Sequence, residues 1–217
     1  MSATATSAKI EKSKRQPKKR REAIFTALRQ CIIDQGYATT TLADIAHAAD
    51  MTPSHLLYYF SDKADILSQY FGNVSLAITS RLAEFENEPP IKRIDFLAKL
   101  FFSGKGLSKS EIGFMLECFG VAVHAPDIKQ QKTELDRICK EYLRALFKDA
   151  GAKASYSTYA AEVSYALLVG LRTAVYFDEE LNLKKAYEIF RGEMMKLVES
   201  LPANERKLKN SGANAAT

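Results

Sequence analysis

The stretch from Thr52 to Tyr59 places hydroxyl, imidazole and phenol side chains on one side of a short helical pattern. Thr52 is a favourable N-cap, and Pro53 suits the first helical position because an N–H has no intrahelical partner there. Leu56 and Phe60 lie one turn apart and would face inwards. The side chains left outside can make adaptable hydrogen-bonding contacts. These outward candidates are Thr52, Pro53, Ser54, His55 and Tyr59.

Positive charge is concentrated in the first 22 residues, which carry eight Lys or Arg side chains against Glu11 and Glu22. Their net charge of +6 exceeds the +5 of the whole chain, so the remaining residues sum to about −1. This asymmetry favours a polyanionic partner that meets the N-terminal segment. Lys18, Lys19 and Arg20 are the candidate contacts. The alternative is a solvated tail that only raises solubility.

The sequence lacks the signatures of the common catalytic sites. It has no Gly-rich phosphate loop, no nucleophile elbow, no His-Glu-x-x-His run and no Cys pairs at zinc spacing. We therefore expect no enzyme, no catalytic residue, no metal and no cofactor. Cys31, Cys118 and Cys139 are odd in number and lie on apolar helical faces, which favours core thiols in a reducing compartment. No stretch has the pattern of a signal peptide or a membrane span, so the expected location is the cytoplasm.

Helices must position these residues. Ten glycines and six prolines among 217 residues are too few for the turns of a β-sandwich or barrel, and apolar residues recur every three to four positions. The expected fold class is all-α. A first helix over about 18–35 has one apolar face and is followed by Gly36, and a second begins at Thr41, which precedes Asp44 by three residues as in a capping box.

The second helix and the helix that starts at Thr52 are separated only by Asp50 and Met51. Two short helices in this order, backed by the apolar helix over 18–35, have the layout of a helix-turn-helix. The N-terminal residues of the second helix in such a motif enter the major groove of DNA. The half-site cannot be read from these side chains, since none is an arginine that would favour guanine.

Further helices are expected along the rest of the chain. A long one runs from Asp62 to the Pro89-Pro90 break, and five more cover about 91–103, 108–123, 127–150, 155–177 and 183–200, which makes nine in all. The expected organisation is a flexible basic arm over 1–17, a helix-turn-helix domain over 18–66, a second helical domain over 67–200 and a flexible tail over 201–217.

The run "TTLADIAHAADMTPSHLLYYFSDKADIL" resembles the DNA-binding domain of the TetR family of bacterial transcriptional regulators. The resemblance covers about residues 20–70 and rests on the Thr-x-x-x-Ile-Ala start, the hydrophobic-Ser/Thr pair, Leu-x-x-x-Phe and a Lys three residues later. It implies a cytoplasmic, nucleoid-associated homodimer on double-stranded DNA, usually a repressor, whose domain over 67–200 binds a ligand and dimerises. It also implies phosphate contacts from Thr41 and Lys63, base contacts from the 52–55 segment, and base or backbone contacts from Tyr58 and Tyr59.

This chain departs from the family pattern at three positions. Asp50 and Ser54 stand where the family usually has Gly, and Leu57 stands where it usually has a phosphate-contacting Tyr, so the expected contact shifts to Tyr58. Between residues 23 and 66 there are two basic and five acidic side chains, a net charge of −3. Attraction for phosphates must therefore come from the Lys14–Arg21 segment and from helix N-termini.

A stripe of small residues supports dimerisation. Ala166, Gly170 and Ala174 recur every four residues and would let another helix approach closely. The alternative, packing within one chain, is compatible with this reading. The region also resembles the paired terminal helices through which these regulators dimerise, which implies an inverted-repeat operator. The predicted interface residues are Val163, Ala166, Gly170, Leu171, Ala174, Phe190 and Met194.

A small-molecule effector is expected among the middle helices, in a mainly apolar cavity with a few polar anchors. The alternative is that these aromatic residues are plain core. Another alternative for the whole chain is a helical protein-protein adaptor that has lost DNA binding. The candidate pocket residues are Phe101, Phe102, Phe114, Met115, Phe119, Tyr142, Tyr165, Arg172 and Tyr176.

Overall fold

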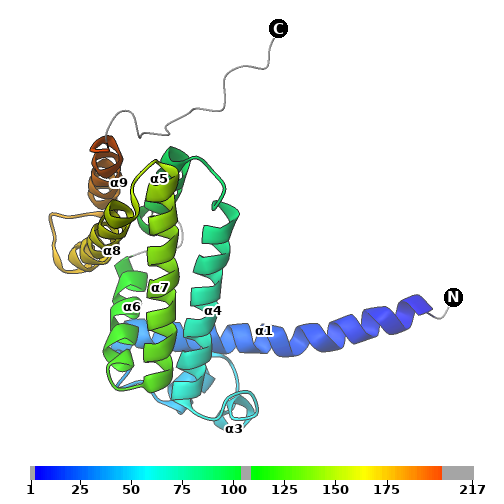
Figure 1. Cartoon of the computed structure of the whole chain (residues 1–217). Coiled ribbons are helices and arrows are strands. Elements are labelled where there is room, and N and C mark those ends of the chain that lie inside the picture. Colours follow the sequence, from blue (N-terminus) through cyan, green and yellow to red (C-terminus); the bar gives the residue numbers. More distant parts are fainter. Residues whose placement is uncertain (1–2, 104–108, 202–217) are drawn as a thin grey trace. The chain divides into compact units, whose positions relative to one another are not determined.

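The computed structural model describes residues 3–103 and 109–201, with side chains from residue 17 onwards, and shows nine helices in these ranges (Figure 1). The all-α class is thereby confirmed. The chain divides into two compact units. Unit 1 comprises Met1–Val74 and Glu117–Lys129, and unit 2 comprises Ser75–Leu116 and Gln130–Thr217. The break expected from Gly104 to Gly106 lies outside the described residues. So does the tail expected over 201–217, except for residue 201.

Unit 1 contains α1 (Ala3–Gln35), α2 (Leu42–Ala48), α3 (Pro53–Leu56) and the first part of α4 (Lys63–Glu84). Helix α1 packs on α2, and α2 packs on α3. The inward faces that the helical spacing predicted are buried here. The fully buried apolar side chains of unit 1 are Ile24, Leu28, Ile45, Ala46, Leu56, Ile66 and Leu67.

Helix α1 begins earlier than the sequence suggested. We expected an arm over 1–17 and a helix from Lys18, but the helix starts at Ala3 (Figure 1). Residues 3–16 include three Ala and three Lys, together with Arg15 and Gln16, and all of these residue types have high helix propensity. Pro17 lies inside α1, where it removes one backbone hydrogen bond but does not end the helix.

Helix α3 is shorter than expected, because it ends at Leu56 and not near Phe60. The N–H groups of Tyr58 and Tyr59 donate to the carbonyl oxygens three residues back, over 3.3 and 2.9 Å. This tighter turn replaces the last α-helical turn. It still carries Phe60 into the core, where 2% of its surface is exposed.

Unit 2 holds all of α5 (Pro90–Phe102), α8 (Ala154–Phe177) and α9 (Leu183–Glu199). It also holds the second part of α4 and most of both α6 (Lys109–Ala122) and α7 (Pro126–Asp149). Helix α9 packs against both α5 and α8. One continuous core joins α5, α7, α8 and α9. Side chains from these four helices that are at most 1% exposed include Ile94, Phe102, Phe147, Ala161, Phe190 and Met194.

The cysteines are free thiols in this structure. Cys118 and Cys139 are buried, and burial raises the pKa of each to about 12, so both stay protonated at neutral pH. Cys31 is half-buried, and burial raises its pKa as well. None of the helices in the described ranges is both long and apolar enough to cross a membrane.

Candidate nucleic-acid interface

The start of α3 presents its polar side chains outwards, as the helical pattern predicted. The Thr52 hydroxyl accepts a hydrogen bond from the His55 N–H over 3.2 Å, and Pro53 occupies the first turn. Leu56 is fully buried and anchors the helix from below. The side chains of residues 52–55 are all exposed. A short helix with a capped start and a buried anchor therefore holds four consecutive residues ready to contact a groove.

Tyr58 is the most exposed large hydrophobic side chain among the described residues of unit 1, with 82% of its surface accessible. Its ring meets the half-buried Tyr59 edge to face at 5.3 Å, and Tyr59 lies 5.5 Å from the His55 ring. Leu57 is 49% exposed beside them. Leu57 cannot make the hydrogen bond of the usual family Tyr, but Tyr58 also faces solvent and can supply it.

Helix α2 begins with the capping box that the Thr41 and Asp44 spacing predicted. The Asp44 N–H donates to the Thr41 hydroxyl over 3.2 Å, and the Thr41 N–H donates to the Asp44 carboxylate over 2.8 Å. Hydrogen bonds to its carboxylate, that of the Thr41 hydroxyl first, lower the pKa of Asp44 below its ordinary value. Thr41 is exposed, as a phosphate contact requires.

The turn between α2 and α3 depends on Asp50. Its φ of 53° lies in the left-handed region, which L-residues other than Asn and Asp seldom adopt. The Met51 N–H then closes the turn by donating to the Ala46 carbonyl over 3.0 Å. Asp50 thus performs the backbone role of the Gly that the family usually has here.

Lys63 is half-buried and makes hydrogen bonds within the protein that the sequence did not predict. Its ammonium donates to the carbonyl oxygens of Tyr37 and Thr40, both at 2.7 Å, and lies 4.2 Å from the centre of the Tyr37 ring. Burial lowers the pKa of Lys63. The Tyr37 N–H donates to the Glu117 carboxylate over 3.1 Å. Two of the three ammonium donors therefore fix the loop that leads into α2, a role that sequence spacing could not reveal.

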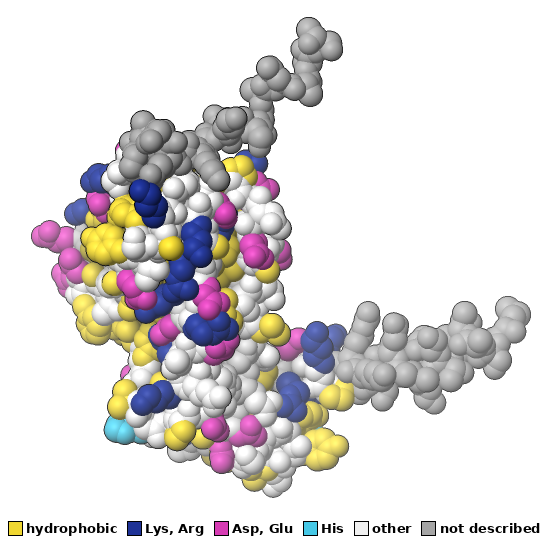
Figure 2. All heavy atoms as spheres, viewed as in Figure 1, with side chains coloured by type: hydrophobic (Ala, Val, Ile, Leu, Met, Phe, Trp, Pro, Cys, Tyr) yellow, Lys and Arg dark blue, Asp and Glu magenta, His cyan; other side chains and the backbone are white. Residues whose placement is uncertain are grey.

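The basic run on α1 divides into exposed and inward members. Lys18, Lys19 and Arg20 are exposed. Arg21 turns inwards, where its guanidinium bonds to Gln69 and lies 4.5 Å from the centre of the Phe60 ring. Figure 2 shows dark-blue Lys and Arg side chains on the described part of α1. The three residues predicted to contact phosphate are thus available for that contact.

The predicted dimer interface is only partly on the surface. Ala166 and Gly170 are exposed on α8, and a Cβ added at Gly170 would meet no neighbouring atom of its own chain within 4 Å. Val163 and Ala174 are half-buried. The other three residues contradict the prediction, because they are buried within a single chain: Leu171, Phe190 and Met194 are 9%, 1% and 0% exposed.

Of the nine predicted pocket residues, Tyr142 lines a cavity of about 330 Å³ in unit 2 and Phe101 lines a smaller one, while the other seven line neither of these two cavities. Phe101, Phe102 and Phe114 are at most 5% exposed and fill the interior. The Tyr165 hydroxyl bonds to Asp136, and the Arg172 guanidinium lies 5.8 Å from the centre of the Phe101 ring. Met115 and Phe119 are half-buried on α6. The Tyr176 ring packs on Gly113, and Tyr142 lines the cavity of about 330 Å³ in unit 2.

Comparisons with known proteins agree with this geometry. Residues 24–70 match the family described as bacterial regulatory proteins, tetR family. A curated relative, the HTH-type transcriptional regulator BetI of Burkholderia thailandensis, is 25% identical over 175 residues, which cover 77% of this chain and 89% of the relative.

Solved structures match over most of the chain. A transcriptional regulator from Rhodococcus sp. Rha1 has a TM-score of 0.73 at 14% identity, over 82% of this chain and 96% of that one. A putative transcriptional regulator from Saccharomonospora viridis in complex with choline has a TM-score of 0.68 at 20% identity, over 85% of this chain and 97% of that one. At these identities the likeness shows that the fold is shared.

Proposed function

Because this chain is a DNA-binding transcriptional regulator of the tetR family, we propose that it is a repressor that binds an inverted-repeat operator as a homodimer and releases it when a small molecule binds. The exposed start of α3 is the observation that carries the proposal. Residues 52–55 project from a helix whose Leu56 is fully buried, and Tyr58 stands beside them with 82% of its surface exposed. Such an arrangement suits insertion into a major groove.

Phosphate contacts complete the proposed interface. Thr41 at the start of α2 and the exposed Lys18, Lys19 and Arg20 on α1 would position the domain on the duplex without reading its sequence. Lys63 would supply its one remaining donor to a phosphate while it holds the loop at Tyr37 and Thr40. The protein would act in the cytoplasm, on the nucleoid when bound.

Dimerisation through the outward face of α8 would set the operator symmetry. We place Ala166 and Gly170 at the centre of this interface, with Val163 and Ala174 beside them, because the first two are exposed and small. The two α3 helices of a symmetric dimer would enter successive major grooves about 34–36 Å apart. The operator would therefore consist of two inverted half-sites.

Release by a small molecule requires that the molecule bind the two conformations with different affinity. The cavity of about 330 Å³ in unit 2 has a volume within the range of small-molecule sites. A structural neighbour from Saccharomonospora viridis was solved in complex with choline, and this supports the proposal of a small-molecule ligand.

Selection of bound duplexes from a random oligonucleotide pool tests the proposal, and should return an inverted repeat. His55→Ala should then weaken binding to the selected operator by about 1–3 kcal/mol and relax its sequence preference. His124→Ala is the matched control, because His124 is also exposed in unit 1 but lies outside the proposed interface. A chain that enriches no sequence and binds no duplex at low salt would refute DNA recognition and favour an adaptor.

A further inference from the structure

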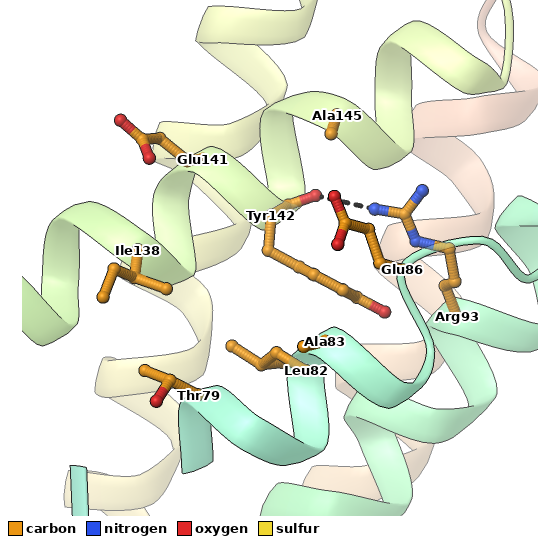
Figure 3. A pocket seen from close by; sticks show the side chains of 9 residues that line it. All are labelled: Thr79, Leu82, Ala83, Glu86, Arg93, Ile138, Glu141, Tyr142 and Ala145. Carbon is orange, nitrogen blue, oxygen red and sulfur yellow. Dashed lines mark hydrogen bonds between the residues drawn. The ribbon is translucent and has the colours of Figure 1, made fainter. Parts of the chain in front are cut away.

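The cavity of about 330 Å³ in unit 2 is lined by α4, α5, α7 and the segment that follows α4 (Figure 3). Its walls are mostly apolar, with Leu82 and Ala83 on α4 and Ile138 and Ala145 on α7. The Thr79 hydroxyl donates to the Leu76 carbonyl over 3.1 Å, so its oxygen can still accept a hydrogen bond. The volume is at the lower end of the 300–1,000 Å³ typical of ligand sites, which limits the occupant to a small molecule.

Three charged residues line this cavity, and two of them are already neutralised. Arg93 is fully buried, and its guanidinium pairs with the Asp149 carboxylate over 2.7 Å and donates to the Tyr142 carbonyl over 3.0 Å. Glu141 pairs with Arg137 over 2.6 Å, and its carboxylate points away from the other lining residues in Figure 3.

Glu86 is the charge that remains. Among the described residues its carboxylate has no ion-pair or hydrogen-bond partner, and Figure 3 shows it among the other lining side chains. It lies close enough to Tyr142 to raise the pKa of that phenol, although burial is the larger cause. One uncompensated carboxylate beside apolar walls and an aromatic side chain is a site for positive charge.

We propose that this cavity binds a small organic cation, an ammonium or quaternary ammonium ion on a short carbon skeleton, with Glu86 as its counter-ion. The carbon skeleton would lie against Leu82, Ala83 and Ile138, and a ligand hydroxyl would donate to Thr79. Binding of the cation does not depend on the proposed function. Its consequence does rest on that function: the cation would be the effector that weakens operator binding.

The rival reading is an anion held by Arg93. It is weaker because Asp149 already compensates the guanidinium, and one face of this group is also occupied: its central carbon lies 4.4 Å from the centre of the Tyr142 ring. An incoming anion would in addition meet the Glu86 carboxylate without a new partner for it. Like charges in one cavity repel each other, and the lining residues include no second cation to offset the repulsion.

Three ligands of one shape separate these readings. Choline, its neutral carbon analogue 3,3-dimethyl-1-butanol and the anion 3,3-dimethylbutanoate should be titrated into the full-length protein by calorimetry, together with tetramethylammonium and ethanolamine. We expect choline or another of the cations to bind at least tenfold more tightly than the neutral and anionic analogues. Absence of binding by all the cations, or tighter binding of the anion, overturns the proposal.

Two variants locate the site. Glu86→Gln keeps the shape and removes the charge, so it should weaken cation binding by about 10- to 100-fold and leave the neutral analogue unaffected. Glu84→Gln is the matched control, since Glu84 is exposed in the same segment as the exposed Glu86 but does not line the cavity. Equal losses in both variants, or none in Glu86→Gln, would exclude Glu86 as the counter-ion. Thermal unfolding of both variants checks that each folds.

Operator binding, measured separately by fluorescence anisotropy, tests the cation site and the proposed repressor function independently. If the bound cation lowers operator affinity in the wild type but not in Glu86→Gln, the cavity is the effector site. If calorimetry shows Glu86-dependent binding and no operator is found, the cation site stands and the proposed repressor function fails. If an operator is found and no cation binds, the repressor function stands and the cation site fails.

Discussion

The ammonium of Lys63 illustrates how one residue can serve two roles in a DNA-binding domain. Its hydrogen bonds to Tyr37 and Thr40 close the loop immediately before Thr41, the first residue of the capping box. Hydrogen bonds from a charged donor contribute about 1.5–3 kcal/mol each when the acceptor is otherwise desolvated. We therefore infer that Lys63 positions Thr41 in addition to any contact with phosphate.

Lys63→Met should lower both stability and DNA affinity. We expect a decrease of about 1.5–3 kcal/mol in the free energy of unfolding, because two charge-assisted hydrogen bonds are lost while the cost of burying the ammonium is also removed. Lys18→Met is the control, since Lys18 is exposed and its replacement should weaken DNA binding while stability changes by less than about 0.5 kcal/mol. Denaturant unfolding and operator titration measure the two effects. A Lys63 variant of normal stability that binds DNA poorly would mean a phosphate contact alone.

Gly113 is a second residue whose role depends on one long-range contact. A Cβ at this position would lie 2.6 Å from the Tyr176 ring, whereas a Cβ at Gly120, on the same helix, would meet no atom within 4 Å. Gly113→Ala should therefore destabilise the protein by about 1–3 kcal/mol through overpacking. Gly120→Ala should stabilise it by about 0.5–1 kcal/mol, since Ala favours a helix. Thermal unfolding that shifts in the same direction for both variants would contradict this packing.

At the scale of the element, α1 combines a structural and an electrostatic function. Its apolar face, including Ile24 and Leu28, is buried in unit 1, while Lys18, Lys19 and Arg20 stay exposed on the same helix. The helix thus carries positive charge on the scaffold that supports α2. This matters because residues 23–66 have a net charge of −3 and would by themselves repel phosphate.

Replacing Lys18, Lys19 and Arg20 together by Gln should weaken operator binding and flatten its dependence on salt. Removing one phosphate-binding side chain reduces the slope of log K against log salt concentration by about 1, so the combined change should approach about 3. Lys184→Gln with Lys185→Gln is the control, because these two lysines are exposed on α9 in unit 2. A salt titration with an unchanged slope would assign the basic run to solubility alone.

At the scale of the whole molecule, the proposed function would require both units and two copies of the chain. Helices α4, α6 and α7 each contribute residues to both units, so the proposed ligand site in unit 2 and the proposed DNA-binding surface in unit 1 share continuous elements. The proposed assembly would use a surface that one chain leaves uncovered. On α8, Ala166 and Gly170 are exposed, and so are the large apolar side chains of Tyr159 and Phe177, which are 60% and 71% accessible.

If the chain dimerises through α8 as proposed, Gly170→Trp should convert the dimer into monomers. A Cβ at this exposed position meets no neighbouring atom of its own chain within 4 Å, so the substitution should disturb assembly more than folding, and thermal unfolding of the variant checks this. In a symmetric interface the substitution occurs twice, and overpacking of about 1–3 kcal/mol per copy gives about 2–6 kcal/mol in the dimerisation free energy. Gly120→Trp is the matched control, since it is equally open but lies in unit 1. Sedimentation that gives one mass for wild type and both variants would disprove this interface.

Local patterns were sufficient to predict much of this protein. The all-α class, the nine helices of the described ranges and the outward set from Thr52 to His55 follow from helical periodicity, N-caps and proline positions. These signals act over a few residues and can be read without knowing the partners. The same holds for the capping box of Thr41 and Asp44, since its two members are only three residues apart.

Contacts between distant residues explain what the sequence could not predict. Arg21 turns inwards because Phe60 and Gln69 surround it, and Lys63 is drawn to Tyr37, 26 positions away. The uncompensated Glu86 emerges only when the partners of the other cavity charges are known. Phe190 also shows the limit, because an apolar residue suits an interface and a core equally well. Periodicity identifies which face of a helix is apolar, but the packing of other helices determines what covers that face.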